Sequence, residues 1–258
     1  MKERLDTLLV AAGLAESKES AQRLILAGEV RVNGQVATKA GHKFPDDAEL
    51  TVAARPRFVS RGGEKLEGAF AAFPEWTVED RVCLDVGSST GGFTDCMLQH
   101  GARRVMAVDV GTNQLHYALR RHPKVWVREK FNARYMTAAD LPEVPSRAVT
   151  DVSFISLKLI LPPMVAVLEP GGEIVSLIKP QFEAGRDQVP GGVVRDEAVR
   201  QAVVEEIRRF GTETLGLTWV GCVTSPLKGP EGNVEFLAYW RKGMQRAAAS
   251  EMPPYRAI

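Results

Sequence analysis

Four charged residues each close a short apolar run in the larger part of this chain. Asp85, Asp109 and Asp151 follow runs rich in valine, leucine and alanine, and Lys179 ends the run that begins at Glu173. Such runs predict buried strands of a parallel sheet, whose carboxyl ends meet at one edge, where ligands bind. We therefore expect the four side chains to share one crevice. A carboxylate there can accept hydrogen bonds from both hydroxyls of a ribose, so the residue types indicate a site for a nucleoside.

Glu235 is a further charged residue in an unusual setting. It lies in an apolar segment that predicts a strand over 233–239. An unpaired carboxylate inside a buried strand would be costly, so Glu235 needs a partner, for which a lysine is the best candidate.

The stretch 82–95 must position much of this chemistry, because it predicts a strand, a glycine-rich turn and a helix from Phe93 onward. The turn does not fit the dinucleotide fingerprint G-x-G-x-x-G, and no Gly-Lys-Ser/Thr closes it as in a P-loop. Residues 87–91 do match G-x-S-x-G, the turn that presents the serine nucleophile of α/β-hydrolases. That fold needs a histidine after the serine and the acid, whereas the last histidine here is His122, which disfavours a hydrolase triad.

A nucleoside cofactor such as S-adenosylmethionine suits this turn, because backbone N–H groups and a helix N-terminus would face it. In this interpretation Gly87 and Gly91 approach the methionine end, Asp109 the ribose and the region of Asn132 the adenine. A glycine turn without any ligand is the alternative. The candidate cofactor-binding residues are Asp85, Gly87, Ser88, Ser89, Thr90, Gly91, Gly92, Phe93, Asp109, Val110 and Asn132.

The composition describes an ordinary globular protein with a formal net charge of +1, which by itself indicates no nucleic-acid partner. Cys83, Cys96 and Cys222 are scattered without C-x-x-C or histidine neighbours, so we expect neither a metal site nor a disulfide framework, and a cytoplasmic protein. No apolar run approaches the ~18 residues of a membrane span, and acidic residues interrupt any resemblance of the N-terminus to a signal peptide.

The first fifty residues predict two helices and a hairpin. Ser17 can cap the second helix, Gly28 can end it, and Asn33-Gly34 is a strong hairpin turn. The order and spacing of these features over residues 1–52 resemble the S4 RNA-binding domain. The resemblance implies that basic side chains contact RNA phosphates, although a solvated charged face is the alternative. The candidate RNA-binding residues are Arg4, Lys18, Arg23, Arg31 and Lys39, with Arg57 and Arg61 near a basic linker over residues 53–60.

Strands and helices alternate from residue 61 to about 246, which predicts an α/β fold with a parallel sheet covered on both faces. Helices are expected near 60–73 and 196–210, strands at 103–108, 125–127, 148–150, 173–178 and 215–223, and a long loop over 180–192. Residues 247–258 are expected to form an adaptable tail.

Four residues give this domain a resemblance to the FtsJ-like ribose 2′-O-methyltransferases. Lys65, Asp151 in Thr-Asp-Val-Ser-Phe-Ile-Ser, Lys179 in Ile-Lys-Pro-Gln-Phe-Glu and Glu235 in Gly-Asn-Val-Glu-Phe match that family's Lys-Asp-Lys-Glu tetrad. With the S4-like segment in front, the chain resembles the TlyA family of rRNA 2′-O-methyltransferases, also labelled haemolysin A, over residues 1–241. Pro190 stands where that family more usually has a lysine.

The resemblance implies a Rossmann-like sheet, S-adenosylmethionine as cofactor, and methyl transfer to a ribose 2′-hydroxyl in ribosomal RNA or ribosomal subunits, by resemblance that of a cytidine. It also implies Lys179 as the base, Asp151 as the residue that orients it, and Lys65 and Glu235 as positioning residues. For each of the four, a salt bridge at a sheet edge is the alternative. Other functions consistent with the chain are a membrane-active haemolysin and a non-catalytic RNA-binding assembly factor. The short N-terminus favours large-subunit RNA as the target.

Overall fold

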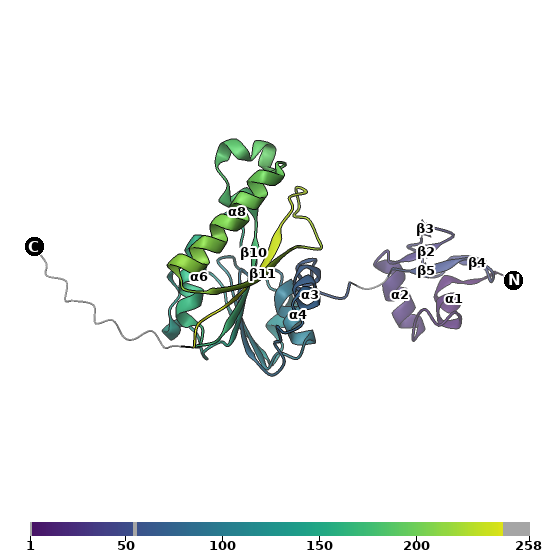
Figure 1. Ribbon diagram of the computed structural model, residues 1–258. Coiled ribbons are helices and arrows are strands. Elements are labelled where there is room, and N and C mark those ends of the chain that lie inside the picture. Colours follow the sequence, from purple (N-terminus) through teal and green to yellow (C-terminus); the bar gives the residue numbers. More distant parts are fainter. Residues whose placement is uncertain (1, 54–55, 245–258) are drawn as a thin grey trace, which may run out of the picture. The chain divides into compact units, whose positions relative to one another are not determined.

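The computed structural model describes residues 2–53 and 56–244 (Figure 1). The chain divides into two compact units, residues 1–56 and residues 57–258. The expected tail over 247–258 and linker residues 54 and 55 lie outside the described residues. Residues 57–60 were expected to belong to the linker, but they pack on the second unit: Phe58 is buried in its core, and the Val59 N–H donates to Asp95 Oδ2 (2.8 Å).

The first unit is a small α+β fold, and its two helices pack on a core that includes Leu5, Leu9 and Ile25. Ser17 accepts a hydrogen bond from the Ser20 N–H (3.1 Å), which confirms the predicted cap. The predicted hairpin is confirmed by the pairing of Val32 with Gln35. The unit's elements are β1 (Lys2–Arg4), α1 (Leu5–Ala11), α2 (Lys18–Leu26), β2 (Val30–Val32), β3 (Gln35–Val36), β4 (Lys43–Pro45) and β5 (Leu50–Val52).

Two strand pairings in this unit had no signal in the sequence. Strand β1 pairs antiparallel with β4, and β5 joins β2 in a sheet of order β3-β2-β5. Each of these strands has only three residues, too few to show an alternating pattern.

The second unit contains a seven-stranded sheet of order β11-β12-β10-β9-β6-β7-β8. The five strands from β10 to β8 are parallel, and β12 and β11 add to that edge in antiparallel pairing. The strands are β6 (Val82–Val86), β7 (Arg104–Val108), β8 (Val125–Arg128), β9 (Arg147–Thr150), β10 (Glu173–Ile178), β11 (Thr218–Thr224) and β12 (Phe236–Arg241). The predicted α/β fold with a mostly parallel sheet is confirmed.

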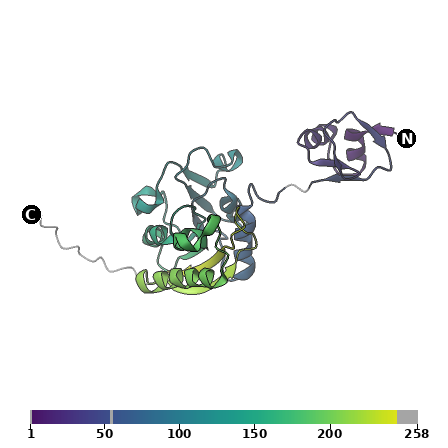
Figure 2. The ribbon, with the colours of Figure 1, turned by 90° about the horizontal axis from the view of Figure 1, so that it is seen from above.

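Helices cover both faces of this sheet (Figures 1 and 2). The alternation of side chains along β6 separates the two cores, because Leu84 faces the core under α6 and Cys83 faces the core under α3 and α4. The α-helices of this unit are α3 (Gly62–Ala72), α4 (Gly92–Gln99), α5 (Tyr117–Arg120), α6 (Leu157–Val167), α7 (Pro180–Glu183) and α8 (Glu197–Arg209). Short 3-10 helices cover 133–135, 138–140, 186–188 and 190–192, and a π-helical turn covers 210–214.

Helix α6 was not predicted, because it contains Pro162 and Pro163. Proline removes a backbone donor and normally breaks a helix interior, so no helix was expected there. Burial of Ile160, Leu161 and Met164 against the sheet stabilises the helix. Tertiary packing overrides local preference at this point.

Candidate active site

The glycine-rich turn between β6 and α4 is built by backbone geometry that few side chains permit. Gly87 has φ +80°, and a Cβ there would lie 2.9 Å from the backbone oxygen of Asp151. Gly91 has φ +99° and serves as the N-cap of α4. The turn therefore passes close to the end of β9, at a point where a side chain at residue 87 would collide with Asp151.

Ser89 shows why the hydrolase pattern at this turn is misleading. Its N–H donates to Asp109 Oδ2 (2.8 Å), which ties the turn to the end of β7. Within residues 2–53 and 56–244, no histidine forms a hydrogen bond with Ser89. The turn binds the neighbouring strand end instead of assembling a catalytic triad.

Asp85 lies beneath the turn. It was predicted to share the crevice, but its side chain does not reach it. Its side chain is completely buried and lines neither of the two cavities described below. Thr94 Oγ1 donates to Asp85 Oδ2 (2.6 Å). Burial, with the nearby negative charges of Asp151 and Asp109, raises the pKa of Asp85 to about 7. The role that this arrangement supports for Asp85 is to hold α4 against β6.

Asp109 anchors a cavity of about 480 Å³ at the ends of β6, β7 and β9. The Gly111 N–H donates to its Oδ1 (2.6 Å), so each carboxylate oxygen accepts one backbone hydrogen bond and retains a further lone pair. The wall is largely apolar, with Val86, Phe131 and Ile155 among its residues. Val110 and Asn132, both predicted to contact the cofactor, also line this cavity.

A second cavity of about 540 Å³ lies on the other side of the turn. It shares Gly87, Ser89, Asp151 and Ser153 with the first cavity, so the two form one continuous crevice. The predicted turn residues that line it are Gly87, Ser88, Ser89, Thr90, Gly92 and Phe93.

Lys179 and Asp151 both line this second cavity and contact each other. Their Nζ and Oδ1 atoms form an ion pair at 2.5 Å, and Lys179 Nζ also donates to Ser153 Oγ (2.9 Å). Only about a tenth of the Lys179 side chain is exposed, and the residue lines the cavity. The two residues follow β10 and β9, which are neighbours in the sheet, so parallel pairing brings them together as expected.

Lys65 supplies the partner that the burial of Glu235 requires. Their Nζ and Oε2 atoms are 2.6 Å apart, and Glu235 is only 1% exposed. Lys65 Nζ also lies 4.0 Å from Asp151 Oδ2, which links this pair to Lys179 in a chain of alternating charges. The structure thus brings Lys65, Asp151, Lys179 and Glu235 together. Glu235 does not lie inside a strand, however, because β12 begins one residue later, at Phe236.

Three residues around the charged cluster were missed by the sequence analysis. Ser153 accepts the hydrogen bond from Lys179, and Gln181 Nε2 donates to Glu235 Oε1 (3.3 Å). Phe154 is 91% exposed at the cavity wall, has φ +63° and packs against the Phe182 ring. A bulky residue in the left-handed region is strained, and such strain concentrates at functional sites. The only sequence signal was their position next to Asp151 and Lys179.

The basic residues predicted to bind RNA have different surroundings. Arg61 is exposed and lines the second cavity, whereas Arg57 pairs with Glu67 (2.8 Å). In the first unit, Arg4 forms an ion pair with the buried Asp6 (2.6 Å), so this part of its guanidinium is engaged within the unit. The other predicted residues of that unit are all exposed: Lys18, Arg23, Arg31 and Lys39.

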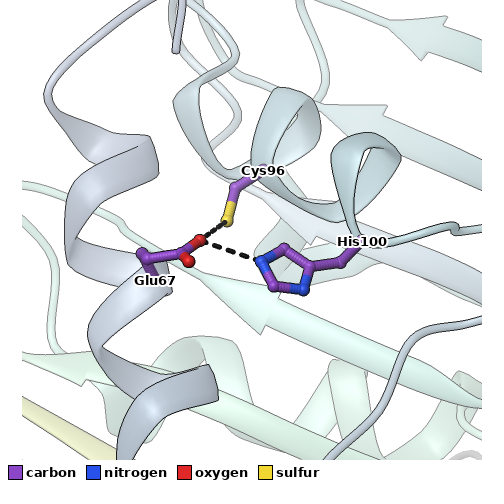
Figure 3. A group of neighbouring side chains, drawn as sticks. All are labelled: Glu67, Cys96 and His100. Atoms are coloured by element: carbon purple, nitrogen blue, oxygen red, sulfur yellow. Dashed lines mark hydrogen bonds and ion pairs between the residues drawn. The ribbon is translucent and has the colours of Figure 1, made fainter. Parts of the chain in front are cut away.

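The expectation that no cysteine has a histidine neighbour is wrong for Cys96. His100 follows it by one turn of α4, and both side chains contact Glu67 on α3 (Figure 3). The i, i+4 spacing of Cys96 and His100, which places two side chains on one face of a helix, was the signal that could have indicated this contact.

Within the described part of the chain, no helix combines the length and the apolar composition needed to cross a bilayer.

Comparisons with known proteins match a separate family model to each of the two units. Residues 58–242 match the model of the FtsJ-like methyltransferases, and residues 3–50 match the S4 domain. A Bacillus subtilis protein provisionally named rRNA methyltransferase YqxC is 48% identical, over 98% of this chain and 90% of its own length. The Mycobacterium tuberculosis 16S/23S rRNA (cytidine-2′-O)-methyltransferase TlyA is 44% identical, over 96% of this chain and 93% of its own. A solved structure of a Streptococcus thermophilus protein, provisionally described as a hemolysin, is 47% identical with a TM-score of 0.72, and covers 94% of this chain and 89% of that one.

Proposed function

Because this chain belongs to the FtsJ-like methyltransferase family, as its resemblance to the TlyA proteins predicted, we propose that it methylates a cytidine ribose 2′-hydroxyl in ribosomal RNA. S-adenosylmethionine is the methyl donor in this proposal. The observation that carries it is the Lys179–Asp151 ion pair, which lines the same crevice as the glycine-rich turn.

The crevice fits this cofactor in shape and donor set. The turn residues Gly87, Ser88 and Thr90 line the crevice, where they would contact the methionine end. The free lone pairs of Asp109 suit the two ribose hydroxyls, and the apolar wall of its cavity suits adenine. The cofactor would supply an electrophilic methyl group on a sulfonium sulfur.

Lys179 is the residue best placed to remove the proton of the ribose hydroxyl. In the proposed reaction the hydroxyl oxygen would bond to the methyl carbon as the carbon–sulfur bond breaks and the cofactor leaves as a neutral thioether. The hydroxyl proton would pass to Lys179 Nζ, which acts as the base once it has given up its own proton. Asp151 and Ser153 fix the Nζ atom of Lys179 between them, which restricts the directions from which a hydroxyl can approach. Asp151 also stabilises the ammonium that results.

Lys65 and Glu235 act as positioning residues in this scheme. Their ion pair lies next to Asp151 and fixes the second carboxylate oxygen of that residue at 4.0 Å from Lys65 Nζ. Both side chains are at least nine-tenths buried, so the pair is held by the surrounding packing and by Gln181.

Features at the surface support RNA as the substrate. The exposed ring of Phe154 stands at the cavity wall, where a base could stack on it once its nucleotide entered the crevice. Exposed basic residues of the S4 unit, among them Lys18 on α2 and Arg31 on β2, suit RNA phosphates. The cytidine assignment rests on the name of the M. tuberculosis relative.

The variant Lys179→Ala tests the proposal. We expect it to retain S-adenosylmethionine binding, measured by calorimetry, and to lose at least about 100-fold in the rate of labelled methyl transfer to ribosomal RNA. Mapping of 2′-O-methyl positions in RNA from cells with and without the gene would identify the target nucleotide.

Lys158→Ala is a matched control, because Lys158 lies on α6 and pairs with Glu206 outside the crevice. Full methyl transfer by Lys179→Ala would reject Lys179 as the base. Methylation of a base instead of the ribose would reject the reaction class.

A further inference from the structure

Three side chains that take no part in the proposed reaction converge between α3 and α4. Glu67 lies on α3, Cys96 lies on α4, and His100, one turn after Cys96, is the C-cap residue of α4 (Figure 3). Glu67 Oε2 is 2.8 Å from His100 Nε2 and 3.7 Å from Cys96 Sγ. The ligand atoms of the three residues all lie within 4.8 Å of one another.

These distances are close to those of a tetrahedral metal site. With bonds of about 2.0–2.1 Å to nitrogen and oxygen and about 2.3 Å to sulfur, neighbouring ligands of Zn²⁺ lie about 3.3–3.6 Å apart. The separations of 2.8 and 3.7 Å each differ from this range by well under 1 Å, and the third, from Cys96 Sγ to the His100 ring, is at most 4.8 Å. Rotation of exposed parts of Glu67 and His100 can supply such shifts.

The surroundings already orient two of the three ligands. The His100 ring stacks on Phe70, with ring centroids 3.7 Å apart and planes 5° from parallel, and its Nε2 points at Glu67. Arg57 holds the other carboxylate oxygen of Glu67 at 2.8 Å, which leaves Oε2 directed toward the cysteine and the histidine. A metal ligand needs this kind of support to keep its direction.

Access also suits a cation. Cys96 is buried, but about a third of the Glu67 side chain and 28% of the His100 side chain are exposed. A metal ion can therefore reach the site, and solvent can supply its fourth ligand.

We propose that Glu67, Cys96 and His100 form a binding site for Zn²⁺, with three protein ligands and one position open to solvent. The ion would join α3 to α4. Lys65 lies two residues before Glu67 on α3, and the glycine-rich turn leads directly into α4, so the ion would brace both elements of the crevice from behind. The site is separate from the crevice, because none of its three ligands lines either cavity.

The test uses the full chain, stripped of metal by a chelator and then titrated with Zn²⁺ and with Co²⁺ as a spectroscopic substitute. We expect one Zn²⁺ per chain, a thiolate-to-cobalt charge-transfer band, and a thermal unfolding midpoint that rises with the Zn²⁺ concentration. Cys96→Ser should abolish the charge-transfer band. His100→Gln, at a partly exposed position that tolerates the change, should weaken Zn²⁺ binding at least about 10-fold.

Cys222→Ser and His122→Gln are matched controls, because they remove one thiol and one imidazole away from the cluster. Both controls should bind Zn²⁺ like the parent chain. The proposal is overturned if the parent chain binds no stoichiometric Zn²⁺, or if His100→Gln and Cys96→Ser bind it as tightly as the controls do. Methyl transfer is not the readout, so this result is independent of the proposed function.

Discussion

The two sides of the crevice are built in opposite ways. The cofactor side consists mainly of one continuous segment, residues 86–93, together with Asp109, and its geometry comes from the backbone. The charged side joins Lys65, Asp151, Lys179 and Glu235 from four distant segments, and it is held by ion pairs between side chains. The first should therefore be sensitive to an added Cβ, whereas the second should be sensitive to the loss of a charge partner.

The largest expected effect is on the charged side. Lys65→Met leaves the carboxylate of Glu235, which is 1% exposed, without a cation, and should lower the free energy of unfolding by about 3–5 kcal/mol. Glu235→Gln should cost less, because Lys65 retains Asp151 at 4.0 Å. Urea unfolding followed by tryptophan fluorescence measures both, since all four tryptophans lie in the second unit.

The double variant Lys65→Met, Glu235→Gln serves as the control for this comparison. It should recover part of the loss, because no unpaired buried charge remains. Equal and additive losses in the two single variants would show that the pair contributes by packing alone.

Asp85, beneath the turn, should make stability depend on pH. Its pKa is raised from 3.8 to about 7 in the folded chain, so the folded state holds this proton more tightly than the unfolded state does. The resulting stabilisation is complete below pH 4 and is lost as the pH rises to 7, by up to about 4 kcal/mol. Asp85→Asn, which keeps an acceptor for Thr94, should remove this slope from the urea unfolding data. An unchanged slope would contradict the assignment to Asp85.

A smaller effect is expected from an added methyl group in the turn. In Gly87→Ala the Cβ would meet the Asp151 oxygen at 2.9 Å in a left-handed backbone conformation, which costs of order 1–3 kcal/mol. Affinity for S-adenosylmethionine, measured by calorimetry, should fall about 10- to 100-fold. Gly216→Ala has similar strain, with φ +64°, but no atom within 4 Å of the added carbon. Gly216→Ala should bind S-adenosylmethionine with the affinity of the parent chain. An equal loss of affinity in both variants would contradict a special role for Gly87.

Local patterns predicted most of the fold. The strand ending at Asp85, the turn after it and the helix from Phe93 follow from an apolar run and glycines that neighbour one another in the chain. Helix α6 was missed because Pro162 and Pro163 oppose helix formation locally, and only its burial against the sheet compensates. The last strand was also misplaced locally. The apolar neighbours of Glu235 predicted a strand that includes this residue, whereas β12 begins one residue later, at Phe236.

The sequence by itself determined which residues stand at the strand ends, because hydrophobic periodicity and glycine positions act over a few residues. It also indicated that a carboxylate as buried as Glu235 needs a lysine. The choice of Lys65, which is 170 residues away, was decided only by the tertiary structure. Likewise, only packing of α3 against α4 brings Glu67 to Cys96 and His100. The physical reason is that a charge selects its partner after burial has removed water from both, and which groups are buried together depends on the whole fold.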